Sequence, residues 1–244
     1  MLRFYSIADR HRKFLELYRI NSVEDYTNTI NNLIINLNLL NNQNTYHPDY
    51  IYIEQYLNEL IENCKGRIIF LGCFDVSKEA AIINKYPSKK FILTDVSIKA
   101  LKPLEQNWNN VEVLEATFSN LSPETDDLII TNMTEYLMKK PELTEFLNYG
   151  SDVVLNNVQL YKNNIRVRIY SILSEIYILF KNIIFSQLGH KQLQFRGWLR
   201  TVDDFFISAD SSNKYLKSVI MDKNKDRMRR YGTIHSAMIH YSNK

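Results

Sequence analysis

The chain has 244 residues, of which 45% are hydrophobic, and its 30 Lys and Arg residues outnumber its 27 Asp and Glu residues by a net charge of +3. This length allows one large domain with an extension rather than two equal domains. The small net charge does not by itself indicate a nucleic-acid-binding protein. Only two cysteines, Cys64 and Cys73, are present and no Cys and His residues cluster, so neither a disulfide framework nor a zinc site is expected and a cytoplasmic protein is favoured.

The first 65 residues carry helical signals. Apolar residues recur three and four positions apart, as between Ile30 and Leu37, and a further helical stretch, "YIEQYLNELIENC", follows a polar loop. The N-terminal stretch "MLRFYSIADRHRKFLELYR" interrupts each apolar step with charge, unlike a secretory signal. We therefore predict a helical N-terminal cap over residues 1–65 and do not expect export.

From Gly66 the pattern changes to short apolar runs separated by helical or polar segments. Near-continuous apolar strands that alternate with helices are typical of a parallel sheet covered on both faces. The sequence therefore predicts an α/β protein with a Rossmann-like, doubly wound and mostly parallel sheet. The runs are "RIIFLG" (67–72), "KFILTD" (90–95), "VEVLEA" (111–116), "DLIITN" (127–132) and "DVVLNN" (152–157).

A long apolar segment, Ile169 to Leu188, follows the fifth run. It contains Glu175 and Lys181 where the centre of a bilayer would fall, which is costly in lipid. We therefore expect a mostly buried helix and no membrane span.

The C-terminal part predicts one helix and two strands. The stretch "GWLRTVDDFFISADSS" begins with a Thr cap and carries a helical pattern, and the strand candidates are residues 215–222 and 232–242. The charged connection between them is too short for a crossover helix, so the last two strands should pair antiparallel. The predicted sheet then has seven strands and ends in an antiparallel hairpin.

This order of strands, with "FLGCFDVSKEAAII" after the first and "FILTDVS" at the second, resembles the class I S-adenosylmethionine-dependent methyltransferases. The resemblance covers residues 66–244, which we predict to be a Rossmann-like methyltransferase domain, and it implies S-adenosylmethionine as the cofactor. Gly72 lies where the chain must turn sharply with a molecule close to its backbone. Asp95, at the end of the second strand, would accept hydrogen bonds from the ribose hydroxyls.

By the same resemblance, the residues after the third strand would flank the adenine, and those at the end of the fourth would line the methionine end and the substrate. Asp75 could meet the methionine ammonium, since a carboxylate pairs naturally with a cation. The residues expected at the cofactor are Gly72, Cys73, Phe74, Asp75, Asp95, Val96, Ala116, Thr117, Thr131, Asn132 and Met133.

Each of these assignments has a plainer alternative. Gly72 could be an ordinary turn glycine, and Asp95 could merely cap a helix that begins near Ser97. The chain also carries Phe74 and Val76 where the family often has glycines.

A catalytic base is needed if the methyl acceptor is a hydroxyl group, and histidine suits that role near neutral pH. His190 is the best histidine candidate because it lies in a loop, where functional residues gather. Tyr136, just beyond the fourth strand, could touch the substrate or simply contribute to packing.

We therefore expect a methyltransferase acting on a small molecule, such as a sugar or another metabolite, at oxygen or nitrogen, and requiring no metal. The fourth strand is followed by "TNMTEY" rather than by Asn-Pro-Pro-Tyr, so nucleic-acid bases are disfavoured as acceptors. The alternatives are an aminopropyl-type transferase that uses a donor derived from S-adenosylmethionine, and a binding or scaffold subunit of this fold without turnover. The sequence is compatible with a homodimer as well as with a monomer.

Overall fold

The computed structural model describes residues 50–73, 76–95, 101–132, 134, 135, 138, 140–161, 200–222 and 234–244, together with residues 165, 169, 172, 173, 176 and 180. The chain divides into two compact units. Every helix and strand named below lies in the unit formed by Thr45–Ser171 and Gly197–Lys244.

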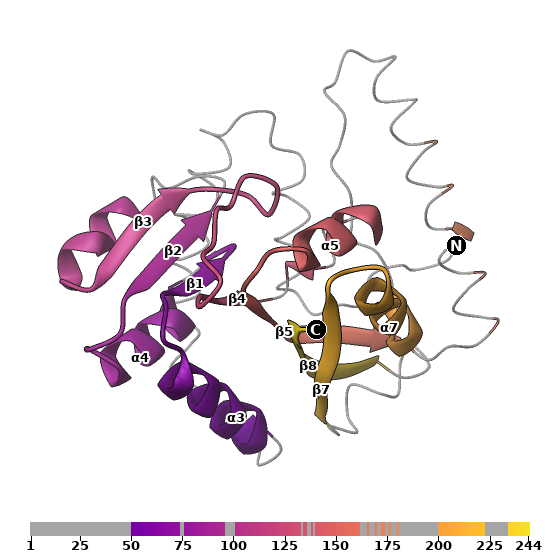
Figure 1. Cartoon of the computed structure of the whole chain (residues 1–244), viewed down its shortest axis with the longest axis horizontal. Helices are drawn as coiled ribbons and strands as arrows, with labels where there is room; N and C mark the ends of the chain where they lie inside the picture. Colours follow the sequence, from indigo (N-terminus) through magenta and orange to yellow (C-terminus); the bar gives the residue numbers. More distant parts are fainter. Residues whose placement is uncertain are drawn as a thin grey trace. The chain divides into compact units, whose positions relative to one another are not determined.

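The centre of this unit is a sheet in the order β3-β2-β1-β4-β5-β8-β7, with the short β6 paired to β5 (Figure 1). Strands β1 to β5 run parallel, whereas β8 pairs antiparallel with both β5 and β7. The strands are β1 (Ile68–Leu71), β2 (Phe91–Asp95), β3 (Val111–Glu115), β4 (Leu128–Asn132), β5 (Asp152–Tyr161), β6 (Arg200–Thr201), β7 (Lys214–Asp222) and β8 (Ile234–Asn243).

Helices cover both faces of the sheet. Leu57 of α3 and Ile83 of α4 pack with Ile130 in one buried cluster, whereas α5 and α7 pack with Ile129 in the other. Successive residues of a strand point to opposite faces, so β4 contributes to both clusters. The helices are α3 (Tyr50–Asn63), α4 (Ser77–Lys85), α5 (Lys140–Leu147) and α7 (Val202–Asp210), and a 3-10 helix, η2, spans Lys102–Asn107.

The predicted sheet is confirmed. Each of the seven predicted strands is present within a few residues of its predicted position, and the sheet ends in the antiparallel β7–β8 hairpin. The predicted Thr cap is also present, since the Thr201 N–H donates to Asp204 Oδ2 at 2.8 Å where α7 begins.

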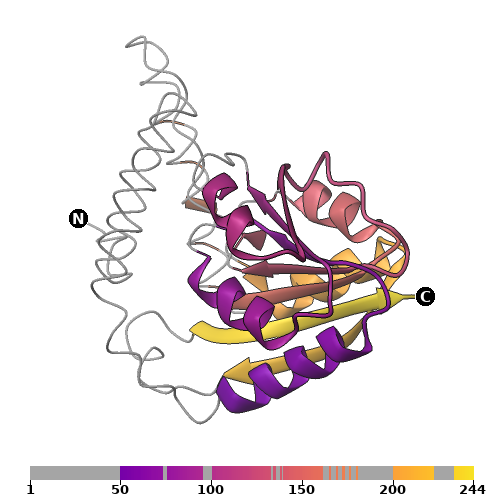
Figure 2. The ribbon, with the colours of Figure 1, turned by 90° about the vertical axis from the view of Figure 1, so that its left-hand side faces the viewer.

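Helix α3 belongs to the part of the sequence assigned above to the cap. Figure 2 shows it running alongside β7 and β8. Its Tyr56 hydroxyl hydrogen-bonds to His240 Nδ1 at 2.9 Å, and its Ile53 and Ile61 are buried in the same cluster as Ile68 of β1. Residues 1–49 of the predicted cap lie outside the described residues, and a domain boundary at residue 65 stays a prediction.

The segment from 169 to 188 was expected to be a mostly buried helix. Its five described residues, Ile169, Ile172, Leu173, Ile176 and Phe180, are 45 to 61% exposed, and the other residues of the segment lie outside the described residues, so its burial as a whole stays a prediction. No helix in the described part of the chain is long and apolar enough to cross a membrane.

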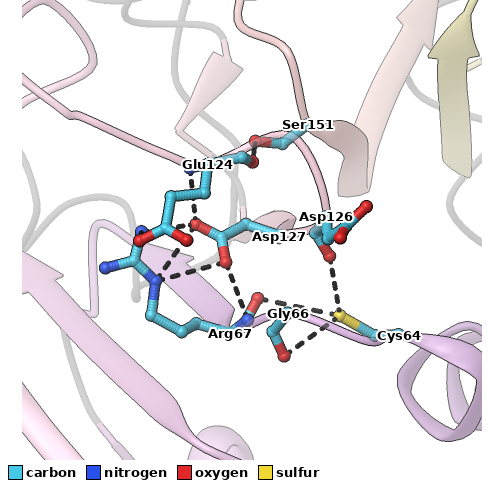
Figure 3. A network of polar contacts seen from close by, with 7 residues as sticks. All are labelled: Cys64, Gly66, Arg67, Glu124, Asp126, Asp127 and Ser151. Carbon is cyan, nitrogen blue, oxygen red and sulfur yellow. Dashed lines mark hydrogen bonds and ion pairs between the residues drawn. The ribbon is translucent and has the colours of Figure 1, made fainter.

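A polar network fixes the edge of the sheet where the parallel strands begin (Figure 3). Asp127, just before β4, accepts hydrogen bonds from the Arg67 backbone at 2.7 Å, from Arg67 Nη2 at 2.6 Å and from the Glu124 N–H at 2.8 Å. The Ser151 hydroxyl donates to Glu124 O at 2.7 Å, which links the start of β5 to the same loop. These contacts hold the starts of three neighbouring strands in register.

Candidate functional site

The opposite edge, where the parallel strands end, begins with the turn at Gly72. This residue has φ = 76°, a left-handed conformation that glycine adopts without strain. A Cβ atom added there would lie 2.3 Å from Thr134 Cγ2. The Gly72 and Cys73 N–H groups both donate to Thr94 O, at 2.9 and 3.0 Å, and so tie the turn to the end of β2. The glycine therefore also allows close approach of the segment that follows β4.

Two carboxylates lie near this turn. Asp95 ends β2 and Glu79 belongs to the first turn of α4, and each side chain is 5% exposed. The pKa of the buried Cys73 thiol is raised well above its ordinary value, first by burial and then by the negative charges of Glu79 and Asp95. The carboxylates of Glu79 and Asp95 therefore both lie close enough to Cys73, at the ends of β1 and β2, to act on its thiol.

The end of β3 is tied to the same edge. The Ala116 N–H donates to Asp95 O at 3.1 Å, so the residue that follows β3 is held next to the end of β2. Thr117 begins a turn in which its N–H donates to Asn120 Oδ1 at 2.6 Å. Ala116 is 8% exposed, and its small side chain belongs to the core cluster beneath α5 and α7.

The ends of β4 and β5 carry a chain of amide groups. Asn132 Nδ2 donates to Glu79 Oε1 at 2.8 Å, and Asn132 Oδ1 accepts from Asn156 Nδ2 at 2.9 Å. The neighbouring Thr131 is fully buried, and its hydroxyl oxygen has no hydrogen-bond partner among the described residues. Because the two residues are adjacent on one strand, their side chains leave opposite faces of the sheet.

The buried Arg200 secures the segment that follows β4. Its Nη2 donates to Met138 O and, at 3.4 Å, to Glu135 O, so β6 holds this loop against the sheet. Burial lowers the pKa of Arg200, against the opposing effect of Glu135 and other nearby anionic groups. The sequence alone did not single out Arg200, because a lone arginine before a helix gives no signal.

The structure describes seven of the predicted cofactor residues. Five of them lie at the ends of β1 to β4, namely Gly72, Asp95, Ala116, Thr131 and Asn132. The other two, Cys73 and Thr117, follow Gly72 and Ala116 in the sequence. Phe74, Asp75, Val96, Met133 and both catalytic candidates, Tyr136 and His190, lie outside the described residues, so their roles stay predictions.

Sequence reasoning also missed Glu79, Asn156 and Asn157. The signal for Glu79 was weak, since an acidic residue in the first turn of a helix is common. Asn156 and Asn157 close an apolar run in the same way as Asp95 and Asn132, and that shared pattern could have marked them.

The sequence matches no family model and no curated protein. Among solved structures, a LepI variant in complex with SAH and a substrate analogue is 15% identical with a TM-score of 0.53, and the alignment covers 91% of this chain and 54% of that one. The mycolic acid cyclopropane synthase CmaA1, in complex with SAH and CTAB, is 11% identical with a TM-score of 0.54, covering 78% of this chain and 83% of that one. This chain thus spans about half the length of the LepI chain.

At these identities the likeness establishes the fold. With its strand order, its antiparallel hairpin and these structural neighbours, the chain has the fold of the class I S-adenosylmethionine-dependent methyltransferases.

Proposed function

We propose that this protein is an S-adenosylmethionine-dependent methyltransferase that acts on a small molecule at oxygen or nitrogen. The observation that carries the proposal is the pair of nearly buried carboxylates, Glu79 and Asp95, beside the left-handed Gly72 turn. S-adenosylmethionine carries a sulfonium and an ammonium group, and carboxylate oxygen atoms are suited to contact with either cation. The structures of LepI with SAM and of CmaA1 with SAH agree with a ligand of this class on this fold.

The described residues fit the cofactor. Asp95, at the end of β2, would accept hydrogen bonds from the ribose hydroxyls, and Ala116, whose N–H donates to Asp95 O, would lie beside the adenine. Val76 does not obstruct this edge, because its side chain is buried in the cluster beneath α4. The Val76 side chain, at a position where the family often has a glycine, therefore lies in the core.

Bound S-adenosylmethionine would supply an electrophilic methyl group. The chain would contribute alignment of the acceptor for in-line attack and exclusion of water, which together account for much of the rate enhancement in such transfers. Arg200 would act indirectly, since it holds the backbone of Glu135 and Met138, the described residues on either side of Tyr136 in the sequence.

The first test measures the formation of SAH from labelled S-adenosylmethionine with pooled small-molecule acceptors, and the affinity for the cofactor by calorimetric titration, in wild type and in Asp95→Ala. The variant loses hydrogen bonds to a charged acceptor, so we expect it to bind the cofactor about ten- to a hundredfold more weakly than wild type does. Asp210→Ala, which removes an exposed carboxylate at the end of α7, serves as the matched control. Equal affinity of wild type and Asp95→Ala for the cofactor would contradict the proposed ribose site.

Proteins of this fold also perform reactions other than transfer to oxygen or nitrogen. One similar structure is described as a pericyclic reaction enzyme, with 15% identity and a TM-score of 0.52, and CmaA1 is a cyclopropane synthase. Labelled methyl recovered in an acceptor distinguishes methyl transfer from a role in which the cofactor is bound without turnover.

A further inference from the structure

The chain of amides at the ends of β4 and β5 has a fixed direction. An ionised carboxylate can only accept hydrogen bonds, so Glu79 requires Asn132 to turn its NH₂ group toward it. Asn132 Oδ1 then faces β5, where it accepts from Asn156 Nδ2 and, at 3.4 Å, from Asn157 Nδ2. Asn156 Oδ1 in turn accepts the Asn157 N–H at 3.0 Å. Glu79 thereby determines how both amides point.

This direction leaves hydrogen-bond donors at the edge of the sheet. The oxygen atoms of Asn132 and Asn156 are used within the chain of amides, whereas each Nδ2 carries a second hydrogen with no acceptor among the described residues. Two amides that offer only N–H groups suit an oxygen anion such as a carboxylate.

The backbone also places these groups at the edge. The pairing of β5 with β8 shifts register between Leu155 and Val158, and Asn157 within this bulge has φ = 57°. A bulge re-aims the side chains at the point where a strand leaves its regular pairing. Asn132 and Asn157 are partly exposed, whereas Asn156 is 4% exposed, so the accessible donor of the chain of amides is that of Asn132, at the point where β4 ends.

We propose that Glu79 is a positioning residue: by orienting the Asn132 amide, which the buried Asn156 amide supports from β5, it presents the Asn132 N–H donor to the carboxylate of the methionine end of S-adenosylmethionine. This inference rests on the proposed function. It adds a residue outside the glycine turn, on α4, that acts on the cofactor through Asn132 rather than by direct contact.

The test compares three ligands by calorimetry in wild type and in Glu79→Met, which keeps a long side chain in this buried position but removes the acceptor. The ligands are S-adenosylhomocysteine, its decarboxylated analogue and 5′-methylthioadenosine, which lacks the amino-acid end. The variant should bind S-adenosylhomocysteine about tenfold more weakly and the other two as wild type does. Glu79→Gln, which retains an acceptor oxygen, should lose less affinity than Glu79→Met.

The exposed Glu59 of α3 supplies the control, because Glu59→Met removes a carboxylate far from the amides in the sequence and should leave all three affinities unchanged. Equal weakening of all three ligands in Glu79→Met would show a merely structural role and overturn the inference. So would weakening of the decarboxylated analogue, since Glu79 would then act on the ammonium group directly.

Wild type alone also tests the inference if the variants fail to fold. It should bind S-adenosylhomocysteine about tenfold more tightly than the decarboxylated analogue, and equal affinities would overturn the carboxylate site. If wild type binds 5′-methylthioadenosine but shows no preference for the carboxylate, only the inference fails. If it binds none of the three ligands, the proposed function fails as well.

Discussion

Gly72 combines a left-handed backbone with a neighbour that leaves no room for a side chain. Gly72→Ala should therefore destabilise the protein by at least about 1–2 kcal/mol, the cost of a left-handed conformation in a residue with a Cβ atom, and the contact with Thr134 Cγ2 should add to this. Thermal or urea unfolding measures the change.

The matched control for this prediction is Gly150→Ala. A Cβ atom there would meet Thr125 Oγ1 at 3.5 Å, an ordinary contact, so little destabilisation is expected. Thr134→Ser removes the methyl group that faces Gly72 and should recover part of the stability lost in Gly72→Ala. A double variant no more stable than Gly72→Ala would show that the contact with Thr134 is not limiting.

Lys214 predicts a pH dependence. Its side chain is fully buried, its Nζ donates to Ser151 O and Asn243 Oδ1, and burial lowers its pKa to about 8, with Asp152 opposing the shift. Between pH 8 and 10 the unfolded chain then binds more protons at this residue than the folded one. The free energy of unfolding should therefore rise over this range through Lys214, by roughly 2 kcal/mol.

Urea unfolding of wild type and Lys214→Met at several pH values isolates this contribution. The raised pKa values of Cys73 and Tyr241 act in the opposite direction in both proteins, and so cancel in the comparison. The free energy of unfolding of wild type relative to Lys214→Met should increase from pH 8 to 10. A difference that is constant with pH would mean that Lys214 titrates normally.

At the scale of the elements, the Asp127 network joins the starts of β1 and β4 (Figure 3). Asp127→Asn keeps the shape but cannot accept all the hydrogen bonds from Arg67 and Glu124, so we expect a loss of about 3 kcal/mol. The exposed Asp126 offers a matched control, since Asp126→Asn makes the same change of charge one residue away and should have little effect.

The same network predicts sensitivity to acid. Burial acts to raise the pKa of Asp127, but the hydrogen bonds from Arg67 and the Glu124 N–H outweigh it and lower the pKa from its ordinary value. Its stabilisation is therefore fully present above the ordinary pKa of aspartate and is lost as the pH falls through the lowered value. Unfolding curves in acid should show less loss of stability in Asp127→Asn than in wild type, and parallel losses would exclude Asp127 as a source of that sensitivity.

Strands β1 to β4 could be predicted from the sequence because each is short and rich in apolar residues, and each ends at a polar residue or just before a glycine. Strand β5 was predicted to end at Asn157 but continues to Tyr161, since two successive asparagines look like a strand end and are in fact a bulge. The two-residue β6 gave no periodic signal. Pairing with other strands, of β5 with β8 and of β6 with β5, determines both features rather than local pattern.

For the whole molecule, the strand order placed Gly72, Asp95 and Asn132 at one edge of the sheet, and that much of the candidate site could be predicted. The contact between Glu79 and Asn132 could not, because it joins a helix to a strand that follows three further elements in the chain. Neither residue has a local pattern that indicates the other. Arg200 likewise acquires its role only through the folded loop after β4.

The central claim is that the edge of the sheet formed by Gly72, Asp95 and Asn132 binds S-adenosylmethionine. Calorimetric titration of the purified wild-type chain with S-adenosylmethionine, and separately with S-adenosylhomocysteine, tests it most directly. We expect saturable binding of both ligands at one site per chain. Absence of binding to either ligand at the highest soluble concentration would contradict it, and would leave a methyltransferase fold that works through contacts with other molecules.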